Sequence, residues 1–236
     1  MISVKNVSKY FGRFKALNQV SFEIQTGEII GFLGQNGAGK TTLMRILTGY
    51  LKPSGGKIAI GGIDVLKDPL KVRRQMGYLP ENPPLYPVLT VKEYLKFAAQ
   101  LREIPPKSQE KEIQRVLSLC DLKEVSFKPI GHLSKGFKQR VGIAQAIIHD
   151  PAVLILDEPT AGLDPVQNLS VRKLIKDLEY KRTVILSTHI LSEIEQISKR
   201  VLVIKNGSII ADRPLEEWLA VSASSSLEEA FIKLVG

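Results

Sequence analysis

The sequence predicts an α/β fold: a core with a mixed, mainly parallel sheet, an antiparallel β edge and an inserted helical subdomain. Apolar runs at 29–33, 152–156 and 183–187 have the length and composition of strands buried on both faces. Residues 2–24 instead alternate over short stretches, which is typical of antiparallel strands. From about residue 90 to 150 the apolar spacing becomes helical, so a helical subdomain interrupts the sheet.

Length and composition favour one domain. The chain has 236 residues, of which 44% are hydrophobic, enough for a large core with an attached subdomain. Low complexity is confined to Ser222–Ser226, which we interpret as a linker to a terminal amphipathic helix. The expected organisation is a single domain over 1–236, with an α/β core at about 1–80 and 151–212, a helical subdomain at about 81–150 and a C-terminal helical tail at about 213–236.

The first third of the chain has the turns that an antiparallel edge requires. Pro and Gly at 52–56 exclude a helix there, and Pro83 and Pro84 end the last short strand of this region. The expected strands are 2–7, 20–24, 57–60 and 76–80, with turns at Gly12 and at Thr26 and Gly27.

Capping and proline signals divide the helical subdomain into three helices. Thr90 is expected to cap the first, with Glu93 completing a capping box. Pro105 and Pro106 break the pattern before a second helix around 113–120, and a third runs from 135 to 149. After Pro151 we expect buried strands at 152–156 and 183–187 with a helix between them, then short strands near 201–204 and 208–211.

Several classes of protein are disfavoured by charge and composition. No apolar run approaches the roughly 18 residues of a membrane-spanning helix, and Met1–Lys5 reaches a charge too early for a signal peptide. Cys120 is the only cysteine, which suits a reducing compartment, so we expect a cytoplasmic protein. The net charge is +9, but bases alternate with acids, as in 107–112. We therefore expect no nucleic-acid partner and favour an anionic membrane surface or an acidic partner.

The segment Gly34–Thr41 matches the phosphate-binding pattern G-x-x-x-x-G-K-[ST] between a predicted strand and a predicted helix. Its glycines let successive backbone N–H groups point at one anion, and the helix N-terminus adds positive charge. Lys40 would reach the β- and γ-phosphates, and the Thr41 hydroxyl would ligate Mg²⁺. The sequence thus predicts a P-loop NTPase core whose nucleotide is bound by Gly34, Asn36, Gly37, Ala38, Gly39, Lys40, Thr41 and Thr42.

Two acids follow the apolar run at 152–156, at the end of the strand where open α/β sheets bind ligands. Asp157 would hold the magnesium, directly or through water. Glu158 would accept a proton from the attacking water or orient it. The alternative is that both acids merely cap the turn that contains Pro159 and Thr160.

A third motif, Leu133–Val141 (LSKGFKQRV), resembles the signature sequence of ATP-binding cassette (ABC) ATPases, and it lies between the two motifs above, as in that family. Ala161–Asp164 is similar to the family's D-loop, and Ser187–His189 to its H-loop. The motifs occur in the family's order, and the resemblance covers essentially the whole chain.

The resemblance implies a dimer in which each ATP lies between one subunit's phosphate loop and the other's signature. On the matching positions, Ser134 and Gly136 would contact the partner's γ-phosphate, Asp164 would act across the interface and His189 would contact the γ-phosphate. An ordinary capping histidine is the alternative for His189. Phe11 resembles the family's adenine-stacking aromatic residue, with Tyr10 as a rival for that role.

The chain departs from the family pattern at two places. In the signature, usually L-S-G-G-Q, Lys135 replaces a glycine and Phe137 the glutamine. Lys135 would attract the γ-phosphate or fix the helix cap, and Phe137 would pack on the helical subdomain. Glu81 stands where the family has a glutamine and would still ligate magnesium. These substitutions are similar to those of export-type ATPase subunits.

The resemblance therefore implies an ATP- and Mg²⁺-dependent hydrolase that powers a membrane transporter of the export type. Expected partners are transmembrane permease subunits and a second ABC ATPase domain, most simply a homodimer, at the cytoplasmic face of the membrane. The segment Glu81–Phe97 would dock the permease, unless its aromatic residues belong to the core of the helical subdomain. Soluble ABC ATPases of translation or DNA maintenance are the alternative. A non-hydrolysing regulator is a third class, which would need a broken catalytic set, whereas the catalytic residues Glu158, His189 and Lys40 are intact.

Overall fold

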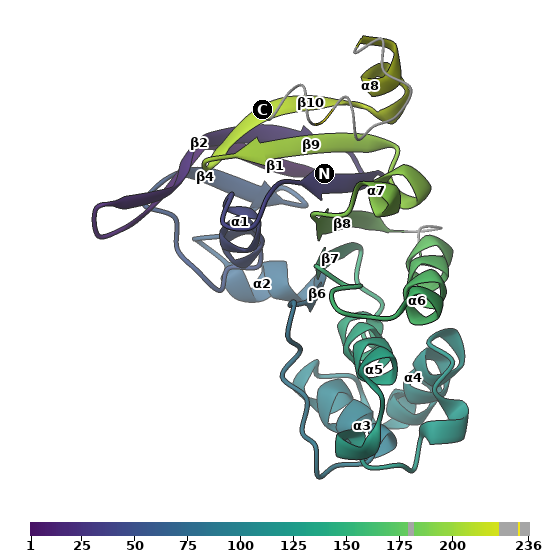
Figure 1. Ribbon diagram of the computed structural model, residues 1–236. Coiled ribbons are helices and arrows are strands. Elements are labelled where there is room, and N and C mark those ends of the chain that lie inside the picture. Colours follow the sequence, from purple (N-terminus) through teal and green to yellow (C-terminus); the bar gives the residue numbers. More distant parts are fainter. Residues whose placement is uncertain (179–181, 222–230, 232–236) are drawn as a thin grey trace.

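A computed structural model describes residues 1–178, 182–221 and 231. A six-stranded sheet in the order β10-β9-β3-β8-β7-β6 runs through the core (Figure 1). All its neighbouring pairs are parallel except β10 with β9, so the predicted fold class is confirmed. Its strands are β3 (Ile29–Leu33), β6 (Met76–Leu79), β7 (Val153–Asp157), β8 (Thr183–Thr188), β9 (Arg200–Lys205) and β10 (Ser208–Pro214).

This sheet is buried on both faces, as its apolar runs predict. Successive side chains of a strand point to opposite faces. In β7, Leu154 and Leu156 accordingly belong to one hydrophobic cluster, and Val153 and Ile155 belong to the other. Because β3, β6, β7 and β8 are parallel, their carboxyl ends lie at the same edge of the sheet. The two hydrophobic clusters pack on the two faces of these strands.

The antiparallel part forms a second sheet, in the order β2-β1-β4-β5, in addition to the antiparallel edge strand β10. Its first strands are longer than expected because β1 and β2 contain register shifts, and Asn6 and Gln19 have positive φ values of 51° and 49°. Such bulges interrupt the period of two on which the sequence pattern depends. The strands are β1 (Ile2–Phe11), β2 (Phe14–Ile24), β4 (Gly55–Ile60) and β5 (Ile63–Asp64).

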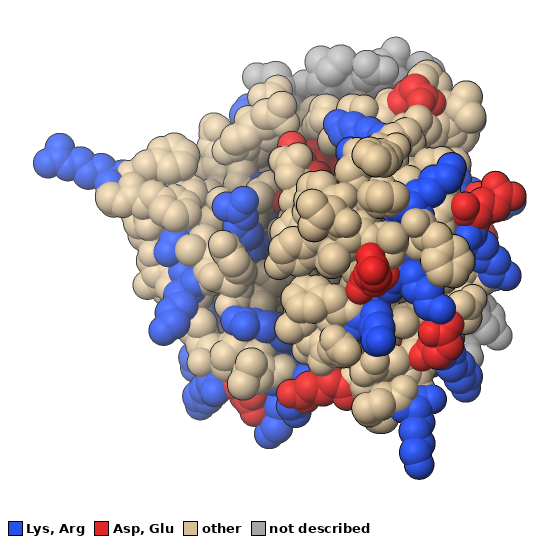
Figure 2. Space-filling model, turned by 90° about the horizontal axis from the view of Figure 1, so that it is seen from below, with Lys and Arg blue, Asp and Glu red and all other residues tan. Residues whose placement is uncertain are grey.

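Three helices form the insertion at the lower end of the molecule in Figure 1: α3 (Val91–Leu101), α4 (Pro106–Leu119) and α5 (Lys135–Ile147). The predicted capping box is present, because Thr90 Oγ1 accepts from the Glu93 N–H and Glu93 accepts from the Thr90 N–H. Figure 2 shows this end of the molecule: Lys and Arg side chains are spread over it, with Asp and Glu standing among those on one side. This view shows no single continuous basic stripe.

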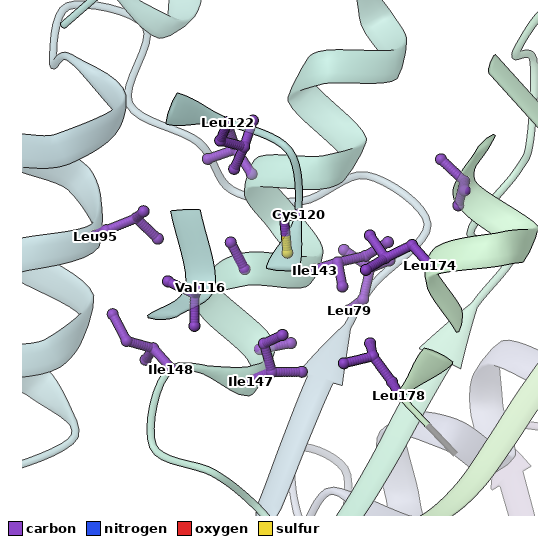
Figure 3. Packing of buried hydrophobic residues seen from close by; sticks show 14 of the residues in the cluster. Leu79, Leu95, Val116, Cys120, Leu122, Ile143, Ile147, Ile148, Leu174 and Leu178 are labelled. Carbon is purple, nitrogen blue, oxygen red and sulfur yellow. The ribbon is translucent and has the colours of Figure 1, made fainter. Parts of the chain in front are cut away.

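The insertion shares its core with the sheet (Figure 3). Leu95, Val116 and Cys120 of the insertion belong to the same cluster as Leu79 of β6 and Leu174 of α6 (Pro165–Asp177). Cys120 is 1% exposed, as expected for a small core residue, and burial raises the pKa of its thiol to about 12. The insertion therefore packs directly against β6 and α6, whose ends border the site described below.

The remaining helices are α1 (Lys40–Leu47), α2 (Pro69–Arg74), α7 (Leu191–Ile197) and α8 (Leu215–Val221). Helices α2 and α7 were not predicted, because they are six and seven residues long and too short to show a clear apolar period. The expected linker at 222–226 and most of the expected terminal helix lie outside the described residues. Among the described residues, no helix is long and apolar enough to cross a membrane.

Candidate nucleotide site

A pocket of about 450 Å³ opens at the carboxyl edge of the large sheet. The segments that follow β3, β6, β7 and β8 meet there with the β1–β2 hairpin of the second sheet. Its lining residues are Phe11, Phe14, Ala16, Gln35, Asn36, Gly37, Gly39, Lys40, Thr41, Thr42, Glu81, Glu158, Ala161 and His189.

The phosphate loop connects β3 to α1, as predicted. Gly37 and Gly39 have φ values of +81° and +110°, which L side chains rarely adopt. A Cβ on Gly34 would lie 2.6 Å from the Ile204 carbonyl oxygen, so the loop also passes too close to β9 for a side chain. Gly34 lines a neighbouring pocket of about 230 Å³, and the Ala38 side chain is buried in the core, so Ala38 offers its backbone only.

Lys40 is the first residue of α1 and is only 6% exposed. Its ammonium group lies 2.6 Å from the Gly34 oxygen, 3.3 Å from the Gln35 oxygen and 3.3 Å from Glu158 Oε1. Three oxygens thus match the three donors of an ammonium group. This fixes a positive charge between the phosphate loop and the acids after β7.

Asp157 is the last residue of β7 and is fully buried. Its Oδ1 accepts from the Ser187 hydroxyl, whereas Oδ2 has no hydrogen-bond partner among the described residues. Burial raises the pKa of this carboxyl, and the hydrogen bond from Ser187 and the nearby Thr41 hydroxyl act in the opposite direction. A buried oxygen without a partner next to a hydroxyl is suited to a hard cation.

Glu158 has a φ of 49°, a conformation that is costly for a residue with a Cβ. Its carboxylate lies between two nitrogen atoms of basic side chains, because Oε1 lies 3.3 Å from Lys40 Nζ and Oε2 lies 2.9 Å from His189 Nδ1. Both acids therefore have contacts beyond the turn after β7. His189 likewise contacts Glu158, and the cap residue of α7 is Ile190.

Glu81 is exposed and lines the pocket, so its backbone position would allow contact with a bound cation. No group of three or more His, Cys, Asp or Glu side chains suited to a metal occurs among the described residues. Because Asp157 Oδ2 is buried without a partner, Thr41, Asp157 and Glu81 would fit a cation bound chiefly through phosphate oxygens and water, which is the usual mode of Mg²⁺.

Two aromatic residues, Phe11 and Phe14, line the pocket and face each other across the β1–β2 hairpin. Both are exposed, at 49% and 64%. Tyr10 does not line this pocket, and Lys15 Nζ lies 5.5 Å from the centre of its ring. Phe14 was not predicted, although its position opposite Phe11 across a tight turn was a usable signal.

We expect Phe11→Ala and Phe14→Ala each to weaken ATP binding by about tenfold, because stacking of a base on an aromatic ring contributes about 1–3 kcal/mol. Hydrolysis of ATP that is already bound should change little. Fluorescence titration with a nucleotide analogue and single-turnover hydrolysis separate the two effects. Tyr10→Ala is the matched control, and a loss of affinity in that variant alone would transfer the role to Tyr10.

The signature residues lie apart from the pocket, on a second surface. Ser134 is the N-cap of α5, and its Oγ accepts from the Phe137 N–H at 3.4 Å. Asp164 is the N-cap of α6 and accepts from two backbone N–H groups at 3.0 and 2.9 Å. Gly136 packs against α6, since a Cβ there would lie 2.6 Å from Gln167 Oε1. The beginnings of α5 and α6 thus form one surface.

The two residues that depart from the family signature, Lys135 and Phe137, both contact other parts of the chain. Phe137 packs against the insertion cluster, as its apolar character suggests. The Lys135 ammonium lies over Gly162, where a Cβ would be 2.2 Å from Nζ. Lys135 therefore bridges from the signature to the D-loop of the same chain.

Comparisons with known proteins agree with these motifs. The family model described as "ABC transporter" matches residues 17–161. The bacitracin transport ATP-binding protein BcrA of Bacillus licheniformis is 39% identical over 218 residues, which cover 92% of this chain and 70% of BcrA. A solved ATP-binding subunit of an ABC transporter superposes with a TM-score of 0.88 at 31% identity, covering 99% of both chains.

A second solved structure is the dimeric, post-hydrolysis ATP-binding cassette MJ0796 bound to ADP and Pi. It matches with a TM-score of 0.82 at 26% identity, over 91% of this chain and 99% of that one. The matched family, the shared fold and the nucleotide-type pocket agree with one another. This chain belongs to the ABC transporter ATP-binding protein family and is an ATP hydrolase of that family.

Proposed function

We propose that this ATPase powers an exporter at the cytoplasmic face of a membrane, as a homodimer that encloses two ATP molecules. This proposal rests on the separation of the expected site residues into two groups on the same chain. The pocket holds Lys40, Glu158 and His189, while Ser134 and Asp164 lie outside it at the exposed beginnings of α5 and α6, with Gly136 buried between these two helices. A second copy would bring the beginnings of these helices to the pocket. The dimeric MJ0796 cassette and the transport role in the name of BcrA support the same interpretation.

Thr41, Asp157 and Glu81 would hold Mg²⁺, which supplies charge neutralisation to the phosphates when bound. The buried Asp157 Oδ2 is the atom that most needs such a partner. Thr42 and the N–H groups from Asn36 to Thr41 would bind the phosphates.

Glu158 would be the base that acts on the attacking water. Its two oxygens contact Lys40 and His189. Phosphate oxygens compete for the donors of Lys40, and their binding would release Oε1 to accept from water. His189 would keep Oε2 in place and contact the γ-phosphate. Binding of ATP would thereby prepare the base.

The permease would dock in a groove beside the helical insertion. A cavity of about 860 Å³ lies between α1, α2 and the end of α3, and its lining includes Tyr50, Leu70 and Leu101, which are 78%, 67% and 67% exposed. Exposed apolar surface of this kind marks interaction sites. Arg73, Arg74 and Arg102 also line it, together with Glu103, which is paired with Arg74. The remaining excess of positive charge favours an acidic or carbonyl-rich segment of the permease.

The predicted docking segment Glu81–Phe97 divides into two parts. Tyr94 is 5% exposed and belongs to the insertion core. The Tyr86 and Phe97 rings pack with centres 5.6 Å apart and are 50% and 37% exposed. Because Phe97 and Leu101 are one helical turn apart, they share a face of α3 that leads from Tyr86 toward the groove.

Leu101→Glu is expected to abolish co-purification with a membrane complex while keeping ATP binding, since it places a charge in the proposed contact. Native extraction and pull-down from solubilised membranes measure this directly. Phe127→Glu is the matched control, because Phe127 is 77% exposed but does not line the groove. Sedimentation of the native protein with ribosomes or DNA, and never with membranes, would instead support the soluble alternative.

A further inference from the structure

Glu193 of α7 is a buried acid that the mechanism above does not use. It is 1% exposed, and burying a carboxylate costs several kcal/mol unless it is well hydrogen-bonded. Its described partners are all neutral. Thr188 donates to Oε2 at 2.8 Å, Asn168 donates to Oε1 at 3.2 Å, and the Thr160 hydroxyl also donates to Oε1.

These three donors come from segments that each carry a proposed site residue. Thr160 lies two residues after Glu158, and Thr188 immediately precedes His189. Asn168 lies in the first turn of α6, and its N–H donates to the carbonyl of the N-cap residue Asp164. One carboxylate thus joins the segments of the base, the histidine and the D-loop acid.

The backbone conformation of Glu158 shows why the contacts of Glu193 would matter. Glu158 is held at a positive φ, which persists only when neighbouring contacts enforce it. Thr160 and Thr188 are 2% and 0% exposed, and Thr188 Oγ1 also accepts from the Ile190 N–H at 3.0 Å. Both segments are therefore fixed to the same buried acid on the core side of the pocket.

We infer that Glu193 is a positioning residue that keeps Glu158 and His189 in register with the beginning of α6. The inference rests on the proposed roles of Glu158 and His189 and adds a residue to them. Glu193 itself lies outside the pocket lining. Its loss should therefore lower the rate of hydrolysis without a comparable loss of ATP affinity, because a displacement of about 1 Å in a catalytic group can cost a factor of about 100.

The test uses paired variants of the full chain. Thr188→Val and Thr160→Val remove one donor each at nearly constant volume, whereas Thr188→Ser and Thr160→Ser keep the hydroxyl. We expect each valine variant to lower kcat by about tenfold with KM within about twofold, and each serine variant to retain most of the rate. Glu193→Gln should lower kcat by at least as much as either valine variant.

A merely structural role predicts a different pattern. Ile175→Ala, in the fully buried part of α6, is the control for a general loss of stability. If kcat in the Glu193 and threonine variants fell only as far as in an Ile175→Ala protein of equal Tm, or if Glu193→Gln kept full kcat, the inference would be wrong. A double-mutant cycle adds a sharper criterion: the two valine changes should be less than additive in ln kcat, since both act through one carboxylate.

Failure of this inference is distinguishable from failure of the proposed function. Full turnover by a Glu158→Gln variant would overturn the role of the base itself. Normal turnover by Glu193→Gln beside an inactive Glu158→Gln would overturn only the positioning role.

Discussion

Glu158→Gln is expected to reduce steady-state ATP turnover by about 10² to 10⁴-fold, the usual contribution of a general base. The amide keeps the shape of the side chain but cannot take a proton at neutral pH. ATP affinity should be kept or increased, because the change removes a negative charge that lies 3.3 Å from Lys40 and next to the phosphate loop. Phosphate release and equilibrium binding of labelled ATP measure the two quantities.

The matched control is Glu124→Gln, a change of the same kind at an exposed acid in the insertion. It should leave turnover unaltered. Undiminished hydrolysis by Glu158→Gln would remove Glu158 from the chemistry. His189→Ala is then informative, because His189 would be the remaining candidate for activating the water.

Lys40→Met should cause the second large loss. A hydrogen bond to a charged group contributes about 1.5–3 kcal/mol, so the affinity for ATP should fall by about tenfold to a hundredfold. The variant also leaves Glu158, which is 7% exposed, without its cationic neighbour. Removing one member of a buried pair costs about 3–5 kcal/mol, so the free energy of unfolding should fall as well.

The double variant Lys40→Met, Glu158→Gln separates these two consequences. Neutralising Glu158 removes the uncompensated charge, so denaturant unfolding should show stability partly recovered relative to Lys40→Met. ATP affinity should stay low in both. Equal stability of the single and double variants would mean that the 3.3 Å contact between Lys40 and Glu158 contributes nothing to folding.

Local patterns were sufficient to predict the phosphate loop and the acids after β7. Each is a short run of residues whose conformation depends on its immediate neighbours: glycines with positive φ, a helix start and an apolar strand. The same holds for the capping box at Thr90 and Glu93. The sequence could also place Asp157 and His189 at one sheet edge, because parallel strands bring their carboxyl ends together.

Features that depend on contacts between distant segments could not be predicted in this way. Glu193 is 33 residues from Thr160, and nothing in either segment indicates that they meet. The separate antiparallel sheet and the length of β1 and β2 depend on bulges, which alternation does not show. Phe14 is a different case: it lies close to Phe11 across a tight turn and could have been found from that, but an exposed aromatic residue in a hairpin has no motif that singles it out.

In the proposed dimer, two copies of this chain enclose ATP, and each phosphate loop faces the beginning of α5, with Ser134, in the other copy. The most direct test is the mass in solution of the Glu158→Gln variant, by light scattering, with and without ATP and Mg²⁺. We predict about twice the mass of one chain with ATP, the mass of one chain without it, and loss of the ATP-dependent increase when Ser134→Arg is added. A single-chain mass at saturating ATP would rule out this ATP-bound dimer.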